Sequence, residues 1–241
     1  MMNKSLMTKS LFILCFMMLG VLMAVQLQAQ GKGQGKGLNK KIPSAVPQTG
    51  QTLCYDEIGQ EIDCTNTGQD GEYQSGVDLP EPRFAINGDG TVTDNMSGLM
   101  WQQDMNCIAT HYPGYDNDVP AGDGRVTWQH ALDFVTGINN GTYSECGAGY
   151  TDWRLPNIKE LYSLVHYGFQ GPALSNTAGT GQWTDGDPFI NDPAATFWSS
   201  TTVEVGFNAA WQLGLAGGTV NAGMKSNTSY HYKVLCVRGG I

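Results

Sequence analysis

The alternation of apolar and polar positions is clearest from Arg83 onward. There the segment RFAIN-GDG-TVTD-NMSG-LMWQ alternates over short runs that Gly, Asn and Asp separate. This spacing is typical of a β-meander with turns at its Asn-Gly and Asp-Gly pairs. The oxygen-rich run 87–90 also resembles the start of a calcium loop, but the later bidentate Glu of an EF-hand is missing at the required spacing. We therefore predict an ordinary turn there.

Two segments have helical periodicity instead. Apolar side chains recur at helical spacing over residues 128–139, where Thr127 is placed to cap the helix. Over residues 157–167, Asn157 and Glu160 have the spacing of a capping box, and an apolar stripe follows them. These are the two main helices that the sequence predicts.

Strand patterns return near the C-terminus, after a long loop over residues 166–196 that is rich in Gly, Pro and Asp. We predict a strand at TFWSSTT, a hairpin at AAWQLGL-AGG-TVN and a terminal strand at YHYKVLCVRG. Two helices within an otherwise antiparallel β chain predict an α+β domain with short sheets and long loops.

The N-terminal residues have the features of an export signal. Lys4 and Lys9 precede an almost unbroken apolar run that ends before Ala29, a small residue where a signal peptidase can cut. The alternative is an uncleaved anchor, although the run is slightly short for a bilayer span. We expect a signal peptide at 1–29, and a protein that is secreted, periplasmic or at the cell surface.

Three further segments follow the signal. Residues 30–48 are a flexible, basic, Gly- and Lys-rich linker. Residues 49–78, which we call the strap, are polar and turn-rich and contain too few apolar residues to fold alone. The remaining residues, 79–241, form the main domain. We expect the strap to dock on that domain.

The distribution of charge limits the partners of this protein. After residue 50 there are seven basic and 22 acidic residues, which gives this part a net charge of −15. Such a surface repels nucleic acid, anionic lipid and sulfated polysaccharide unless a local basic patch overrides it. We expect no nucleic-acid partner, and no membrane insertion once the signal is removed.

Five cysteines follow the signal segment and suggest disulfides in an oxidising compartment. Cys54 and Cys64 are close enough in sequence to close a small loop within the strap. Two of Cys107, Cys146 and Cys236 are available for a second bridge. We name Cys146 and Cys236 as its candidate members, and the connectivity of the three stays open at this point.

Five ordered motifs together resemble a known family. They are PRFAINGDGTVTDNMSGLMWQ, WQHALDFV, GYTDWRLPNIKEL, FWSSTT and VLCVRGG. In this order they are similar to the C-terminal domain of the Legionella collagen-like protein, and the strap resembles a leader found before that domain. The resemblance covers about residues 49–241.

The resemblance implies a C-type-lectin-like fold, related to that of the formylglycine-generating enzyme, in surface or secreted bacterial proteins. The named family member is an adhesin that recognises sulfated glycosaminoglycans. This chain differs because it has no collagen-like Gly-X-Y region and because its domain is acidic. The two differences argue against carrying over trimerisation and polyanion binding.

Lectin-like folds usually bind their ligands through long loops, which directs attention to residues 166–196. Trp183 in this loop is placed to stack on a sugar face, and oxygen-bearing side chains follow it. The candidate calcium ligands are Asp185, Asp187, Asn191 and Asp192. Acidic loops are more often simply solvated, and we expect no other cofactor.

The remaining candidates lie on the predicted strands. Trp198 and Trp211 alternate with small and polar neighbours, and burial in the core is the favoured interpretation of both. Trp211 stays a candidate ligand contact together with Asn208 and Asn221 near the final hairpin. For Arg154 we favour internal pairing, with Glu160 as one possible partner, over a role in binding.

Three functions compete at this point. The leading hypothesis is an exported, non-enzymatic adhesion or ligand-binding module for a glycan or a cell-surface protein. It is favoured because no GxSxG, HExxH, P-loop or dinucleotide motif is present. The alternatives are an oxidase of the formylglycine-generating type, which would need Cys146 and Cys236 together as reactive thiols, and a structural cell-envelope component.

Overall fold

The computed structural model describes residues 46–116, 120–205, 208–226 and 231–239. The expected signal segment and almost all of the expected linker lie outside these ranges. None of the helices in the described ranges has the length and apolar composition needed to cross a membrane.

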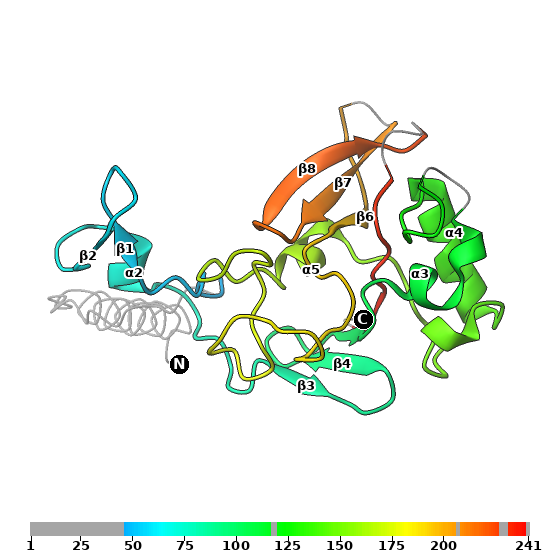
Figure 1. Cartoon of the computed structure of the whole chain (residues 1–241), viewed down its shortest axis with the longest axis horizontal. Coiled ribbons are helices and arrows are strands. Elements are labelled where there is room, and N and C mark those ends of the chain that lie inside the picture. The colour runs from blue at the N-terminus through cyan, green and yellow to red at the C-terminus, as the bar shows by residue number, and fades with distance from the viewer. Residues whose placement is uncertain (1–45, 117–119, 206–207, 227–230, 240–241) are drawn as a thin grey trace, which may run out of the picture. The chain divides into compact units, whose positions relative to one another are not determined.

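The described chain is an α+β fold with three small antiparallel sheets, as the sequence predicts (Figure 1). The more specific C-type-lectin-like architecture stays a prediction. In chain order the elements are β1 (Cys54–Tyr55), β2 (Glu61–Ile62), α2 (Asp70–Tyr73), β3 (Phe84–Ile86), β4 (Thr91–Asp94), β5 (Met100–Gln102), α3 (Cys107–His111), η1 (Pro113–Tyr115), α4 (Trp128–Asn139), η2 (Ser144–Cys146), α5 (Ile158–Tyr162), β6 (Thr196–Thr202), β7 (Ala209–Gly214), β8 (Thr219–Met224) and β9 (Val237–Arg238).

The strap is a small disulfide-bonded unit. Its strands β1 and β2 pair antiparallel, and the Cys54–Cys64 bridge joins the two arms with a Cα–Cα distance of 5.2 Å. This confirms the bridge that the sequence predicts. The strap is tied to the main domain by the backbone N–H of Tyr167, which donates to the carbonyl of Thr49 at 2.8 Å.

The first sheet of the main domain has the strand order β3-β4-β5-β9. The predicted meander forms β3 to β5, and its first turn is closed by the N–H of Asn87, which donates to the carbonyl of Thr91 at 3.0 Å. The turn prediction is therefore confirmed. The terminal strand is much shorter than predicted, because only β9 pairs with β5, while Lys233 forms an isolated bridge with Phe197 of the other sheet.

The second sheet has the order β6-β7-β8, and its two faces bury different side chains. Phe197 and Leu213 pair across β6 and β7 and belong to a cluster that also contains Leu161 of α5. The next residue on β6, Trp198, is fully buried in a second cluster with residues of α4. The core interpretation of Trp198 is thus confirmed, since side chains alternate between the faces of a strand.

The two predicted helices differ in outcome. Helix α4 matches the predicted span, and the Thr127 side chain accepts from the N–H of His130 as its cap. Helix α5 covers only residues 158–162 of the predicted 157–167. A turn continues after α5 as far as Val165, whose N–H donates to the carbonyl of Tyr162. It stops there because tertiary partners take the following backbone groups: the N–H of His166 donates to Ala173 and that of Tyr167 to the strap.

Cys146 and Cys236, the candidates named for the second bridge while its connectivity stayed open, are not bonded to each other. Cys146 is bonded to Cys107, with a Cα–Cα distance of 5.9 Å, and Cys236 is a buried free thiol. The physical reason is the side chain of Gln102, which stands between the two backbones. It donates to the carbonyl of Cys146 at 2.5 Å and accepts from the N–H of Cys236 at 2.9 Å.

Candidate functional site

The candidate site is built around α5, whose start is fixed by the RLPNIKEL segment. The side chain of Asn157 accepts from the backbone N–H groups of Lys159 and Glu160, and the Glu160 carboxylate accepts from the N–H of Asn157. The predicted capping box is therefore present. It holds a helix of one and a half turns that would be marginal alone.

Arg154 also stabilises the start of α5, through the side chain of Glu160. Its guanidinium donates two hydrogen bonds of 2.7 Å to the carboxylate of Glu160 and a third, of 3.0 Å, to the carbonyl of Gly239. Burial raises the pKa of Glu160, but the Arg154 and Asn157 hydrogen bonds outweigh it and keep that pKa below its usual value. The internal pairing predicted for Arg154 is confirmed, so the residue acts as scaffold.

Two tyrosines stand at the exposed end of α5. Tyr162 and Tyr167 are 43% and 39% exposed, with ring centroids 6.3 Å apart in an edge arrangement. Their hydroxyls are 2.6 Å apart, and the hydroxyl of Tyr167 donates to the carbonyl of Gly218 at 3.2 Å. Since a hydroxyl carries one proton, Tyr162 is the donor in the pair and retains free lone pairs.

The Tyr167 hydroxyl stays protonated at neutral pH. Burial raises the pKa of Tyr167 to about 12. The ring therefore offers a neutral, rigid surface with one polar end, which suits ligands that are part apolar and part hydroxylated.

The tyrosines line a groove of about 410 Å³ between α5 and β8, which we call the tyrosine groove. Its lining residues are Ile158, Lys159, Tyr162, Tyr167, Gly218 and Val220. Val220 pairs with Leu213 on β7 and so lies on the α5 face of the sheet. The volume is within the range of small-ligand sites.

Lys159 and Gly218 give the tyrosine groove its chemistry and its shape. Lys159 is exposed and makes no ion pair or hydrogen bond through its ammonium in the described part of the chain. Gly218 has a φ of +68°, and a Cβ there would lie 2.7 Å from Val165. Glycine is thus required for the close approach of the hairpin to α5.

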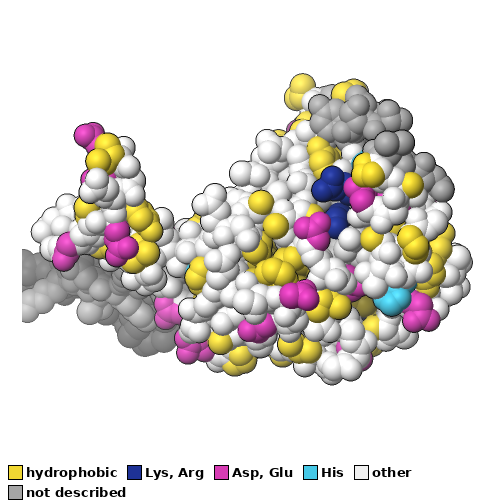
Figure 2. All heavy atoms as spheres, viewed as in Figure 1, with side chains coloured by type: hydrophobic (Ala, Val, Ile, Leu, Met, Phe, Trp, Pro, Cys, Tyr) yellow, Lys and Arg dark blue, Asp and Glu magenta, His cyan; other side chains and the backbone are white. Residues whose placement is uncertain are grey.

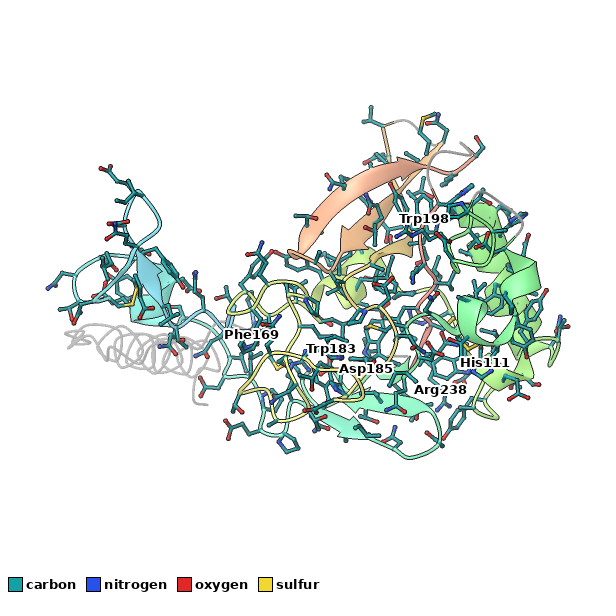
Figure 3. All side chains as sticks on the ribbon, in the orientation of Figure 1. His111, Phe169, Trp183, Asp185, Trp198 and Arg238 are labelled. Atoms are coloured by element: carbon teal, nitrogen blue, oxygen red, sulfur yellow. A yellow bond between two sulfur atoms is a disulfide. The ribbon has the colours of Figure 1, made fainter. Side chains whose placement is uncertain are left out.

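The predicted loop site has its side chains turned to internal partners. Trp183 packs against the core and donates through Nε1 to the carbonyl of Phe189 at 2.9 Å. Asp187 accepts from the N–H of Thr177 at 2.8 Å, and Asp185 accepts from the N–H of Asn191 at 3.1 Å. Figure 3 shows Trp183 and Asp185 close together and Phe169 apart from them.

The four candidate calcium ligands point to different neighbours. Besides the two aspartates, the Asn191 amide donates to the hydroxyl of Thr110, and Asp192 pairs with the buried ammonium of Lys233 at 2.6 Å. Within the described ranges, the one group of three ligand-type side chains is elsewhere, at Asp104, Cys107 and His111. Its cysteine is used by the disulfide, so that group offers a metal two ligands at most.

The hairpin candidates are divided between the two faces of the second sheet. Alternation along the regular β7–β8 register places Trp211 and Val220 on one face and Asn221 on the other. Trp211 is half-buried, while Asn208 and Asn221 are exposed. Trp211 thus lies on the sheet face that carries the tyrosine groove but is not one of its lining residues. The three hairpin candidates therefore do not form one site with the loop candidates Trp183, Asp185 and Asp187.

Tyr162 and Tyr167 are not among the site residues predicted from the sequence. One pattern in the sequence could have found Tyr162: it follows Leu161 directly and therefore lies off the apolar stripe of α5. A tyrosine at such a position has an apolar ring and a polar hydroxyl at the surface, which makes it a candidate ligand contact. No sequence pattern identifies Tyr167, since its position depends on hydrogen bonds to the strap and to Gly218.

The charged side chains after residue 50 are predominantly acidic. Figure 2 shows Asp and Glu side chains distributed over the face in view, with few Lys and Arg among them. Most basic side chains in the described ranges are used internally, as in the buried pair of Arg83 with Asp94 and the Arg238–Asp152 pair at 2.6 Å.

Comparison with known protein families matches residues 90–238 to the family model described as the Lcl C-terminal domain. The match covers more than half of the chain and contains both sides of the tyrosine groove. A search of curated proteins finds no match.

Proposed function

Because the chain belongs to the Lcl C-terminal domain family, we propose that it is a non-enzymatic, extracytoplasmic adhesion module that binds a glycan in its tyrosine groove. It acts in the periplasm, at the cell surface or as a secreted protein. The two disulfides among the described residues support this location, since such bonds persist in oxidising compartments.

The observation that carries the proposal is the exposed pair Tyr162 and Tyr167. Two large aromatic side chains stand at one groove, and their hydroxyls are held by each other and by Gly218, so the rings are presented to a ligand in a fixed arrangement. A sugar presents an apolar C–H face to such a ring and hydroxyls to its polar end. The free ammonium of Lys159 adds a donor for a sugar oxygen.

The arrangement of cysteines gives no support to the oxidase alternative. That chemistry needs two reactive thiols side by side, whereas Cys146 is bonded to Cys107 and burial raises the pKa of Cys236 far above its usual value. A thiol that is buried and protonated is a poor nucleophile and a poor metal ligand.

A protein ligand is the second candidate, and the edge of β8 favours it. This strand is at the end of its sheet, and five of its six residues are exposed. An extended segment of another protein can add to such an edge through backbone hydrogen bonds. The structural cell-envelope alternative has less support, because that function does not account for an exposed groove with aromatic side chains.

The test is a glycan array with the protein expressed with its own leader and purified from the extracytoplasmic fraction. Wild-type protein is compared with Tyr162→Ala and with Tyr73→Ala, which removes an exposed strap tyrosine that does not line the groove. Loss of an aromatic anchor typically costs more than about 1 kcal/mol, so we expect at least a fivefold loss of affinity for Tyr162→Ala only.

Three results would contradict the proposal. The first is an array without any bound glycan. The second is glycan binding that Asp185→Ala abolishes and Tyr162→Ala leaves intact, which would place the site in the loop instead. The third is turnover of a bound glycan, which would make the protein an enzyme.

A further inference from the structure

A second groove of about 490 Å³ opens between the strap and the main domain, and we call it the strap groove. One wall is formed by Gln51, Thr52, Leu53 and Tyr55, and the other by residues 167–170. Tyr167 lines both this groove and the tyrosine groove. The two grooves therefore adjoin at this residue, whose backbone N–H faces the strap and whose hydroxyl reaches Gly218.

The two walls of the strap groove are fixed to each other by packing. The buried imidazole of His166 stacks on Phe169 with a centroid distance of 4.4 Å. On its other side lies Gly50, where a Cβ would be only 2.3 Å from the ring. Together with the hydrogen bond from Tyr167 to Thr49, this contact holds the strap against the domain at the edge of the groove.

Three lining side chains of the strap groove, two amides and one hydroxyl, are neutral and have no partner within the described ranges. The side chains of Gln51, Thr52 and Gln170 make no hydrogen bond there, and no lining residue is charged. Amides and a hydroxyl both donate and accept, as do the hydroxyls of a sugar. Tyr55, Tyr167 and Phe169 add aromatic surface beside them.

From this lining we propose that the tyrosine groove and the strap groove form one extended binding surface for a neutral, linear oligosaccharide, in which the strap supplies the second subsite. This proposal rests on the proposed function and deepens it. Each groove alone has the volume of a small-ligand site. Because both share Tyr167, a chain of sugar units can occupy them in succession.

Charge decides against an acidic chain as the occupant. Lys159 is the one charged residue among those that line the two grooves. The chain after residue 50 carries 22 acidic against seven basic residues. A polyanion would be repelled by that excess and would find a single ammonium to bind, whereas a neutral chain loses nothing.

The experiment measures affinity against chain length. A broad array of neutral linear oligosaccharides selects the best series, and its members of one to six units are then titrated calorimetrically. We expect the affinity to rise at least about tenfold, which is 1.4 kcal/mol, between two and six units. Chains that carry sulfate or carboxylate are titrated in parallel and are expected to bind more weakly.

Variants then separate the two subsites. Tyr55→Ala and Gln51→Ala should abolish the gain with length and leave the affinity for two units unchanged. Tyr162→Ala should weaken binding at every length. Tyr73→Ala, in the same strap but outside both grooves, is the matched control and should behave as wild type; circular dichroism verifies that each variant is folded.

The outcomes distinguish the two proposals. Affinity that is independent of length and insensitive to the strap variants, but lost in Tyr162→Ala, overturns the extended surface and keeps the proposed function. The absence of binding to any carbohydrate overturns both. Binding to sulfated chains alone, or to extended peptides that Tyr162→Ala abolishes, overturns the neutral oligosaccharide as the occupant.

Discussion

Removal of the Cys107–Cys146 bridge should destabilise the protein more than removal of the strap bridge. A disulfide stabilises mainly by restricting the unfolded chain, and the effect grows with the length of the loop that it closes. The separations are 39 residues for Cys107–Cys146 and 10 for Cys54–Cys64. The loop-entropy relation gives about 4 and about 2.7 kcal/mol respectively at 25 °C.

The perturbation is the double substitution Cys107→Ala and Cys146→Ala, compared with Cys54→Ala and Cys64→Ala for the strap bridge and with the single substitution Cys236→Ala. For a chain of this size, about 4 kcal/mol corresponds to a fall in Tm of roughly 8–16 °C. Cys236→Ala removes only one buried sulfur and should cost about 1 kcal/mol. Equilibrium denaturation without reductant measures all three proteins.

Peptide mapping under non-reducing conditions tests the reasoning directly. A peptide that joins residues 107 and 146 is expected, together with a Cys236 thiol that reacts with an alkylating reagent only after denaturation. A Cys146–Cys236 peptide would refute the assigned connectivity. So would a loss of stability in Cys236→Ala as large as that of the double variant, because Cys236 would then be part of a bridge.

Four further predictions follow from the same structure. Asn157→Ala removes the cap of α5 and should cost about 1 kcal/mol in chemical denaturation, while Asn157→Ser should retain most of it. Gly218→Ala forces a side chain into the left-handed region and against a valine, and should cost about 2 kcal/mol with a matching fall in Tm. Burial, and then the charge of Arg83, lower the pKa of His166 below its ordinary 6.5, so the unfolded chain binds the proton more readily. The stability it contributes is complete above about pH 6.5 and decreases below it; thermal melts from pH 7.5 to 5 should show this decrease, and His166→Gln should reduce it. Addition of calcium should leave the Tm unchanged relative to chelator, because the loop carboxylates near Asp185 have internal partners; a rise that Asp185→Ala abolishes would contradict this.

Local features of the fold were predictable from the sequence because they depend on neighbours within a few residues. The capping box of Asn157 and Glu160, the cap of α4 at Thr127 and the turn at 87–90 all close hydrogen bonds over two to four positions. The alternation that buries Trp198 is likewise set by the geometry of a strand.

The tertiary structure alone decided the rest, because the partners are far apart in the sequence. The turn that follows α5 stops at Val165, since Ala173 and the strap take the N–H groups of His166 and Tyr167. Gln102 separates Cys146 from Cys236. The candidate site shows this dependence on tertiary structure most clearly, because its groove forms only when residues near 160, 167 and 219 lie side by side. The sequence by itself determined which short elements form and what charge they carry; only the packing of distant segments determined which side chains share a surface.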